Sequence, residues 1–85
     1  MRNVVIYSTE YCPYCTAVKQ FFDSKGVPFE EIDLSDDRNA LEELKRKNDW
    51  RTVPQVFIGD EFVGGYEETR QLDRKGELDR LLEGD

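Results

Sequence analysis

The chain has 85 residues, 19 of them acidic and 12 basic, and its net charge is −7. This length predicts one domain spanning residues 1–85, with a modest core drawn from a hydrophobic fraction of 38%. The acidic balance argues against non-specific nucleic-acid binding, which needs a basic surface. No apolar run is long enough to span a bilayer, and the first residues lead into a short apolar strand rather than a signal-peptide core, so we expect a cytoplasmic protein.

The first fifth of the chain predicts a strand followed by a helix. Residues 3–8 form a continuous β-branched and aromatic run, typical of a strand that is covered on both faces. A helix is expected over residues 13–24, because Pro13 suits the first helical position and Gly26 suits the end. Its apolar face consists of Ala17, Val18, Phe21 and Phe22.

The remaining elements alternate in the same way and then close with a hairpin. A strand at 29–34 and a helix at 38–47, with Leu41 and Leu44 turned inward, come next. Gly59 and Asp60 form a two-residue turn signal between short strands at 55–58 and 61–63. A helix at 66–74 and a last amphipathic turn carrying Leu78, Leu81 and Leu82 end the chain. The order βαβαββα predicts an α/β fold with parallel neighbours and an antiparallel hairpin.

The only two cysteines, Cys12 and Cys15, stand three residues apart where the first strand gives way to the first helix. One helical turn brings two such sulfurs within bonding distance. Disulfide exchange needs a thiolate, and the free N–H groups and dipole at a helix N-terminus stabilise negative charge on Cys12. Cys15 lies one turn further in and is better placed to resolve a mixed disulfide. The pair therefore predicts reversible dithiol–disulfide exchange.

Three other uses of the cysteine pair remain open from the residues alone. A structural disulfide would close a loop of about four residues and contribute only about 2 kcal/mol. A closed zinc site needs four ligands, and the chain has two cysteines and no histidine, so no metal site is expected within one chain. An iron–sulfur cluster bridging two chains is the third alternative.

Two further segments are informative. Residues 52–55 read Thr-Val-Pro-Gln, with a proline directly before a strand, where a missing N–H is tolerated. Residues 64–68 read Gly-Gly-Tyr-Glu-Glu, and acidic residues in a first helical turn interact favourably with the helix dipole. Each segment alone is also compatible with an ordinary strand start or helix cap.

Taken together, these segments resemble the glutaredoxin family over nearly the whole chain. The resemblance rests on Cys-Pro-Tyr-Cys at 12–15, Thr-Val-Pro-Gln-Val-Phe-Ile-Gly at 52–59 and Gly-Gly-Tyr-Glu-Glu at 64–68. Cys-Pro-Tyr-Cys is specific to the dithiol class of the family. The resemblance implies a thioredoxin fold, with a central four-stranded mixed sheet flanked by helices and a cis bond before Pro54.

The resemblance also implies the roles of the site residues. Cys12 matches the nucleophile and Cys15 the resolving cysteine of an enzyme that reduces protein disulfides and glutathione mixed disulfides. Glutathione is the expected reducing co-substrate, no bound cofactor is expected, and a monomer is the default. The residues assigned to glutathione binding are Tyr14, Arg51, Thr52, Val53, Pro54, Gly65, Tyr66 and Glu67.

The chain departs from the family pattern at two places. Thr9 stands where glutaredoxins commonly carry a lysine, and Glu67-Glu68 replaces the usual aspartate pair. Arg51 and Lys19 are candidates to supply the missing positive charge. The loss of that lysine favours a second hypothesis, a glutathione-independent redoxin that is reduced by thioredoxin reductase and donates electrons to ribonucleotide reductase. An iron–sulfur cluster carrier is a third and less favoured reading, because cluster-binding relatives usually have a single cysteine in this motif.

Overall fold

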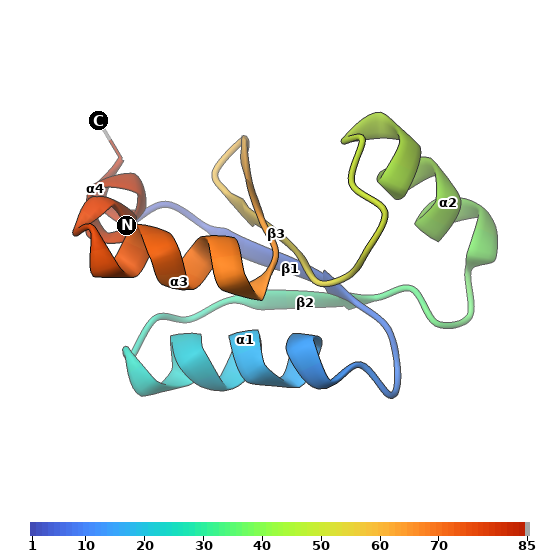
Figure 1. Ribbon diagram of the computed structural model, residues 1–85, viewed down its shortest axis with the longest axis horizontal. Coiled ribbons are helices and arrows are strands. Elements are labelled where there is room, and N and C mark those ends of the chain that lie inside the picture. The colour runs from blue at the N-terminus through green and yellow to red at the C-terminus, as the bar shows by residue number, and fades with distance from the viewer. Residues whose placement is uncertain (85) are drawn as a thin grey trace.

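The computed structural model describes residues 1–84, and its elements follow the predicted order (Figure 1). They are β1 (Val4–Ser8), α1 (Pro13–Ser24), β2 (Glu30–Asp33), α2 (Arg38–Lys47), β3 (Gln55–Ile58), β4 (Glu61–Gly64), α3 (Tyr66–Arg74) and α4 (Glu77–Glu83). One difference lies near the C-terminus, where the expected last turn is a helix of its own. Gly76, at a φ of 76°, allows the chain to turn after α3, and the buried Leu78 and Leu82 fix α4 against the core.

The four strands form one mixed sheet in the order β2-β1-β3-β4. β1 and β2 are parallel and are joined through α1, whereas β3 pairs antiparallel with both β1 and β4. The turn at Gly59 and Asp60 closes the β3–β4 hairpin, and Gly59 has the positive φ of 60° that such a turn requires. The predicted four-stranded mixed sheet flanked by helices is confirmed.

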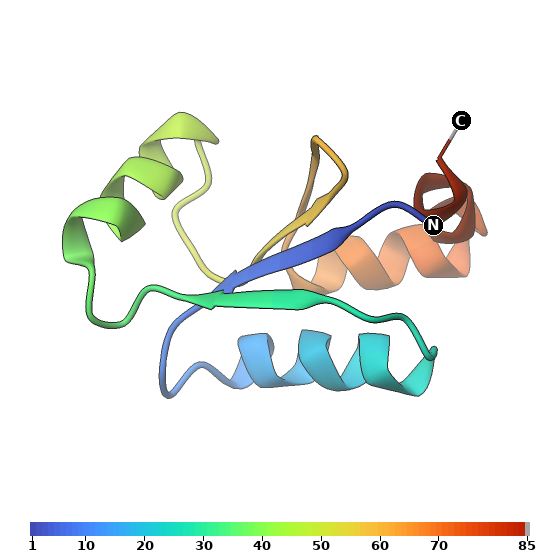
Figure 2. The same ribbon diagram turned by 180° about the vertical axis from the view of Figure 1, so that it is seen from behind.

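The core lies on the face of the sheet that α1 covers. α1 and α2 lie on opposite sides of the sheet in both Figure 1 and Figure 2. Alternate residues of β1 and β3 point toward α1, where they meet the apolar faces of α1 and α4. The buried residues of this core are Val4, Ile6, Val18, Phe22, Val27, Val56, Ile58, Leu78 and Leu82.

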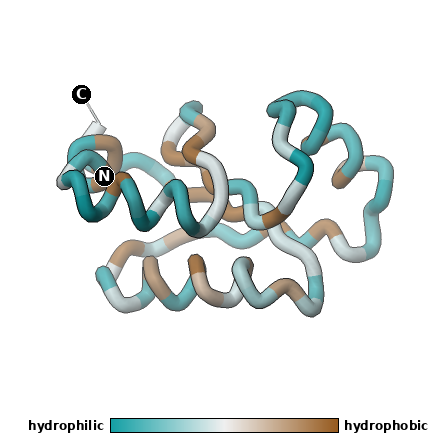
Figure 3. Tube along the Cα trace, in the orientation of Figure 1, coloured by the Kyte–Doolittle hydropathy of each residue, from teal (hydrophilic) through white to brown (hydrophobic). Residues whose placement is uncertain are grey.

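The other face of the sheet is less completely covered than the sequence predicted. Val5 and Tyr7 alternate with the buried residues of β1 and are half-buried, so this strand is fully covered on one face and partly covered on the other. The physical reason lies in α2, which is hydrophilic along most of its length (Figure 3) and contributes no fully buried residue. Its inward Leu41 and Leu44 are half-buried. Aromatic rings cover much of this face instead, with Phe57 packed edge-on against Tyr7 at 5.6 Å between ring centroids.

The end of α2 leads directly into the loop that carries Pro54. Asn48 caps the helix, and Asp49 follows in the left-handed conformation with a φ of 51°. The Trp50 N–H donates to the Lys45 carbonyl at 3.0 Å, and the Asp49 N–H donates to the Arg46 carbonyl at 3.3 Å. These two bonds, one nested inside the other, form the Schellman motif, which terminates helices and turns the chain sharply. No helix within residues 1–84 has the length and apolar character needed to cross a membrane.

Candidate active site

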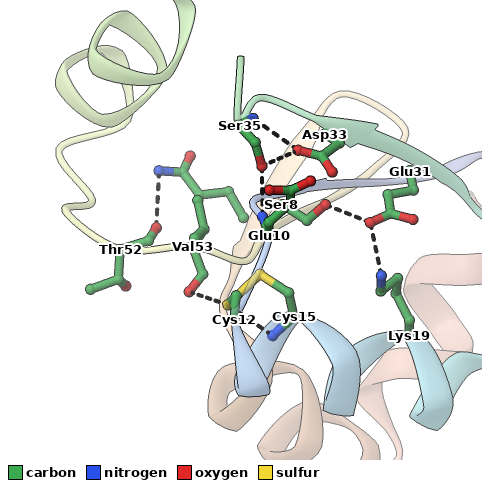
Figure 4. The surroundings of a disulfide bond; sticks show 11 residues. Ser8, Glu10, Cys12, Cys15, Lys19, Glu31, Asp33, Ser35, Thr52 and Val53 are labelled. Atoms are coloured by element: carbon green, nitrogen blue, oxygen red, sulfur yellow. Dashed lines mark hydrogen bonds and ion pairs between the residues drawn. A yellow bond between two sulfur atoms is a disulfide. The ribbon is translucent and has the colours of Figure 1, made fainter. Parts of the chain in front are cut away.

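Cys12 and Cys15 form a disulfide at the start of α1, with their Cα atoms 5.2 Å apart (Figure 4). The two cysteines differ in accessibility. Cys15 is 1% exposed and faces the sheet, whereas Cys12 is partly exposed at the end of the helix. An external thiol or disulfide can therefore approach Cys12 but not Cys15.

Cys12 is the N-cap residue of α1, and its sulfur occupies the place of a capping oxygen. The backbone N–H of Cys15 donates to Cys12 Sγ at 3.1 Å, while the carbonyl of Cys12 accepts from the N–H of Thr16 at 3.1 Å. Pro13 follows at the first helical position, where no N–H is needed. The Cys15 N–H, one of the free donors of the first turn, thus points at the sulfur of Cys12, and together with the helix dipole it stabilises a thiolate there.

The loop before β3 brings a backbone carbonyl to the same sulfur. The peptide bond between Val53 and Pro54 is cis, and the carbonyl oxygen of Val53 lies 3.6 Å from Cys12 Sγ (Figure 4). The cis bond was implied by the family resemblance and is present. The polar backbone of Val53 therefore borders the reacting sulfur.

A groove of about 280 Å³ runs from this loop to the start of α3. Seven of the eight residues that the sequence assigned to glutathione binding line this groove; they are Tyr14, Thr52, Val53, Pro54, Gly65, Tyr66 and Glu67. The rings of Tyr14 and Tyr66 lie 6.3 Å apart between centroids and tilt by 33° to each other. The Tyr66 hydroxyl accepts a hydrogen bond from Arg70 at 2.7 Å, so its ring is held in place.

The far end of the groove is the N-terminus of α3. Glu68 Oε1 accepts a hydrogen bond from the Gly65 N–H at 3.0 Å, and the Thr69 hydroxyl donates to the Gly65 carbonyl at 2.8 Å. These contacts make Glu68 a capping residue, so its carboxylate is already engaged. Glu67, by contrast, is exposed at the groove.

The two cations proposed to replace the missing lysine lie elsewhere. Arg51 is exposed and lines a neighbouring hollow with Lys45, Arg46 and two acidic residues, outside the groove lining. Lys19 forms an ion pair with Glu31 at 2.8 Å (Figure 4). Thr9 lies in a third hollow, between the loop before Cys12 and the start of α2, which Arg38 also lines. The structure therefore places neither Arg51 nor Lys19 on the groove.

A polar network supports the end of β1 beside the cysteines (Figure 4). The fully buried Ser8 hydroxyl donates to Glu31 Oε2 at 2.6 Å, the same oxygen that Lys19 binds. The Lys19 ammonium and the Ser8 hydroxyl hold the pKa of Glu31 below its ordinary value. In the loop after β2, the Ser35 hydroxyl donates to Asp33 and accepts from the Glu10 N–H at 2.6 Å. These bonds fix the loop that leads into Cys12.

A sequence profile of the glutaredoxin family matches residues 4–63 of this chain. The chain belongs to the glutaredoxin family. A curated glutaredoxin of Pseudomonas aeruginosa is 46% identical over 82 residues, which cover 96% of this chain and 98% of that protein. Glutaredoxin 3 of Escherichia coli is 42% identical over 82 residues, which cover 96% of this chain and 99% of that protein.

Solved glutaredoxin structures have the same fold. A buckwheat glutaredoxin–glutathione complex superposes with a TM-score of 0.88 at 33% identity, over 96% of this chain and 77% of that one. The glutaredoxin of Brucella melitensis gives a TM-score of 0.86 at 39% identity, over 96% of this chain and 89% of that one. Together with the Cys12–Cys15 pair, these likenesses make the protein a thiol–disulfide oxidoreductase with a thioredoxin fold.

Two residues of this glutaredoxin line the groove without having been predicted to do so. Trp50 is the only tryptophan of the chain, and its ring packs edge-on against Phe62 at 5.5 Å between centroids. Glu68 was expected only to replace an aspartate, and it lines the groove while it caps α3 through the Gly65 N–H. Its position two residues before Thr52 was the available sequence signal for Trp50, but the same signal was misleading for Arg51, which lies outside the groove lining.

Proposed function

We propose that this glutaredoxin reduces protein disulfides and glutathione mixed disulfides, with glutathione as its reductant. The observation that carries the proposal is the Val53 carbonyl, which lies 3.6 Å from Cys12 Sγ at the head of the groove. A peptide bonded through its cysteine to Cys12 would lie against this backbone and extend along the groove. The reducing cytoplasm, which holds a large glutathione pool, is the compartment that suits the activity.

The proposed reaction divides the work between the two cysteines. The Cys12 thiolate attacks one sulfur of a substrate disulfide, forms a mixed disulfide and releases the other sulfur as a thiolate. Cys15 then loses its proton and attacks Cys12 Sγ, so that the Cys12–Cys15 disulfide forms and the reduced substrate departs. Two molecules of glutathione restore the dithiol and leave as oxidised glutathione. Cys15 is too buried to start the exchange and close enough to finish it.

Glutathione fits the two ends of the groove by its chemistry. Its cysteinyl peptide groups would pair with the backbone of Val53, and its γ-glutamyl carboxylate would meet the N-terminus of α3 at Tyr66 and Glu67. A helix N-terminus favours such an anion. The buckwheat relative, at a TM-score of 0.88, has a structure described as a glutathione complex, which supports the same use of the groove here.

A second candidate is a redoxin that takes electrons from thioredoxin reductase and passes them to ribonucleotide reductase. The observation that favours it is electrostatic. Among the described residues that line the groove, Glu67 and Glu68 are charged and none is basic. Glutathione carries two carboxylates and one ammonium group at neutral pH, so this lining attracts it less than a basic one would.

Steady-state reduction of the oxidised protein with NADPH distinguishes the two candidates. One reaction contains glutathione and glutathione reductase, and the other contains thioredoxin reductase alone. Rapid turnover only with glutathione is the expected result. Turnover only with thioredoxin reductase would contradict the proposed use of glutathione and support the electron source of the second candidate.

A further inference from the structure

A buried amide lies behind the loop that carries Val53. Gln55, the first residue of β3, is 0% exposed. Its neighbour across the sheet is Tyr7 of β1, on the partly covered aromatic face. An apolar side chain would continue that face without cost, whereas a buried amide costs about 1–3 kcal/mol for each polar group left unpaired. The presence of glutamine here therefore calls attention to its hydrogen-bond partners.

Every N–H of this amide and of a second amide has a partner. Gln55 Nε2 donates to the Trp50 carbonyl at 2.9 Å and to the Thr52 carbonyl at 3.4 Å. Gln55 Oε1 accepts from Asn48 Nδ2 at 3.0 Å, and Asn48 Nδ2 also donates to the Leu44 carbonyl at 3.1 Å. The two side chains thus connect the last turn of α2 to both sides of Arg51. We call Asn48 and Gln55 the amide clamp.

The amide clamp acts on the segment that forms one wall of the groove. The backbone of Trp50 is held on both sides: its main-chain N–H donates to α2, and its carbonyl accepts from Gln55. Its ring therefore has a defined place against Phe62. Thr52 is held one residue before Val53, whose carbonyl borders Cys12. No regular strand or helix pairing holds residues 50–54, so these side-chain bonds replace it.

We infer that the amide clamp of Asn48 and Gln55 is a positioning device for substrate binding, which holds the Val53 backbone and the Trp50 ring in register with Cys12. This role rests on the proposed use of the Val53 backbone by the substrate. It predicts an effect on substrate affinity and not on the chemistry of Cys12. The clamp residues themselves touch neither the groove nor the cysteines.

The test uses Gln55→Met, which keeps the length of the side chain and removes its hydrogen bonds. We expect the KM for a glutathione mixed disulfide to rise roughly tenfold, the effect of about 1.4 kcal/mol, with kcat changed less than about twofold. The rate at which iodoacetamide alkylates Cys12 should stay at the wild-type value. Gln71→Met, on the exposed face of α3, is the matched control and should change none of these quantities.

Fluorescence of Trp50 gives a readout that does not depend on the substrate. Since it is the only tryptophan, acrylamide quenching reports on the groove wall directly. We expect the quenching constant to increase about twofold in Gln55→Met, in proportion to the loosening of residues 50–54. An unchanged quenching constant in the folded variant overturns the inference. Increased quenching together with a wild-type protein that does not use glutathione would leave the clamp intact and contradict the proposed function.

A second variant covers the case in which Gln55→Met does not fold. Asn48 is partly exposed, and Asn48→Ala removes one bond of the clamp and the cap of α2 while leaving the Gln55 donors in place. We expect a smaller increase in KM, roughly threefold, again with unchanged alkylation of Cys12. A wild-type KM and quenching constant in Asn48→Ala would likewise overturn the inference.

Discussion

Cys12 Sγ accepts a hydrogen bond of 3.1 Å from the backbone N–H of Cys15, so Cys15 acts on the sulfur of Cys12 through two different groups. Cys15 supplies a thiol for the second step and a backbone donor for the first. The donor belongs to the main chain and survives any substitution of the Cys15 side chain. This separation makes the two functions of Cys15 experimentally distinguishable.

Substitution of each cysteine should therefore have a different outcome. Cys12→Ser should abolish exchange with every substrate, because no accessible nucleophile remains. Cys15→Ser should keep removal of glutathione from glutathionylated proteins, since Cys12 and its backbone donor are intact, and should lose reduction of protein disulfides. Insulin reduction and release of glutathione from a glutathionylated protein measure the two activities. Residual exchange in Cys12→Ser would contradict the assigned roles.

The position of Thr9 predicts how the missing lysine affects glutathione use. Thr9→Lys adds a positive charge on the loop that leads into Cys12. We expect a larger thiolate fraction of Cys12 at neutral pH and a kcat/KM with glutathione increased about two- to fivefold, as for one partly screened charge. Thiolate absorbance and the glutathione-reductase assay measure these effects. Thr9→Gln tests the added length without the charge, and an equal effect from it would remove electrostatics as the cause.

The ion pair between Lys19 and Glu31 predicts a pH-dependent contribution to stability. The pKa of Glu31 in the fold lies below its ordinary 4.5, because Lys19 and Ser8 stabilise the carboxylate. The resulting stability is present above about pH 4.5 and is lost as the pH falls through the folded-state pKa. Glu31→Gln should lower the melting temperature at pH 7 by about 2–4 °C, as expected for a partly exposed ion pair.

The difference in melting temperature between wild type and Glu31→Gln should shrink as the pH is lowered below 4. Thermal melts between pH 3 and pH 7 test this directly. Glu30→Gln serves as the control, because Glu30 is exposed and forms no ion pair among the described residues. A melting-temperature difference for Glu31→Gln that is independent of pH would show that the lost charge is not the cause.

Gly64, the last residue of β4, is a position where an added side chain should affect the groove. Gly64 has a φ of 119°, and a Cβ atom there would lie 2.9 Å from Cβ and Cγ of Glu68, which caps α3. Gly64→Ala should reduce the free energy of unfolding by about 2–3 kcal/mol and weaken glutathione use, because Glu68, which caps α3 and lines the groove, must shift. Chemical denaturation and the KM for the mixed disulfide measure the two effects.

Gly26 provides the matched control for this substitution. It has a φ of 71°, and an alanine Cβ at this position would have no atom within 4 Å, so Gly26→Ala introduces backbone strain without a clash. We expect it to cost about 1–2 kcal/mol and to leave KM unchanged. Equal losses of stability in the two variants would show that Glu68 is not obstructed.

Element positions were predictable because the chain marks them with strong local signals. Pro13 and Gly26 bracket α1, and the turn at Gly59 fixes the hairpin, so the observed bounds lie within about one residue of those expected. The cysteine spacing likewise predicted the disulfide. These features depend on neighbours in sequence, and such interactions can be read from the chain alone.

Features that depend on docking of distant segments were not predictable. Leu41 and Leu44 lie on α2 itself. How deeply they are buried depends on the angle of α2 to the sheet, which no local pattern specifies. Arg51 stands next to Thr52 in sequence, yet the turn after Asp49 directs it toward α2 rather than the groove. The bond between Asn48 and Gln55 spans seven residues and joins the end of α2 to a strand that pairs with β1. Its two amides look like ordinary polar residues in the sequence.

The order β2-β1-β3-β4 leaves β2 as an open edge of the sheet, and three of its four residues are acidic: Glu30, Glu31 and Asp33. An open edge offers unpaired backbone groups to any passing strand and is the usual starting point of aggregation. A second copy approaching this edge would bring the same carboxylates against it, and the repulsion opposes such pairing at neutral pH. The acidic strand therefore opposes assembly of this small redox protein into extended sheets, and this protection should fade in acid as the carboxylates become neutral.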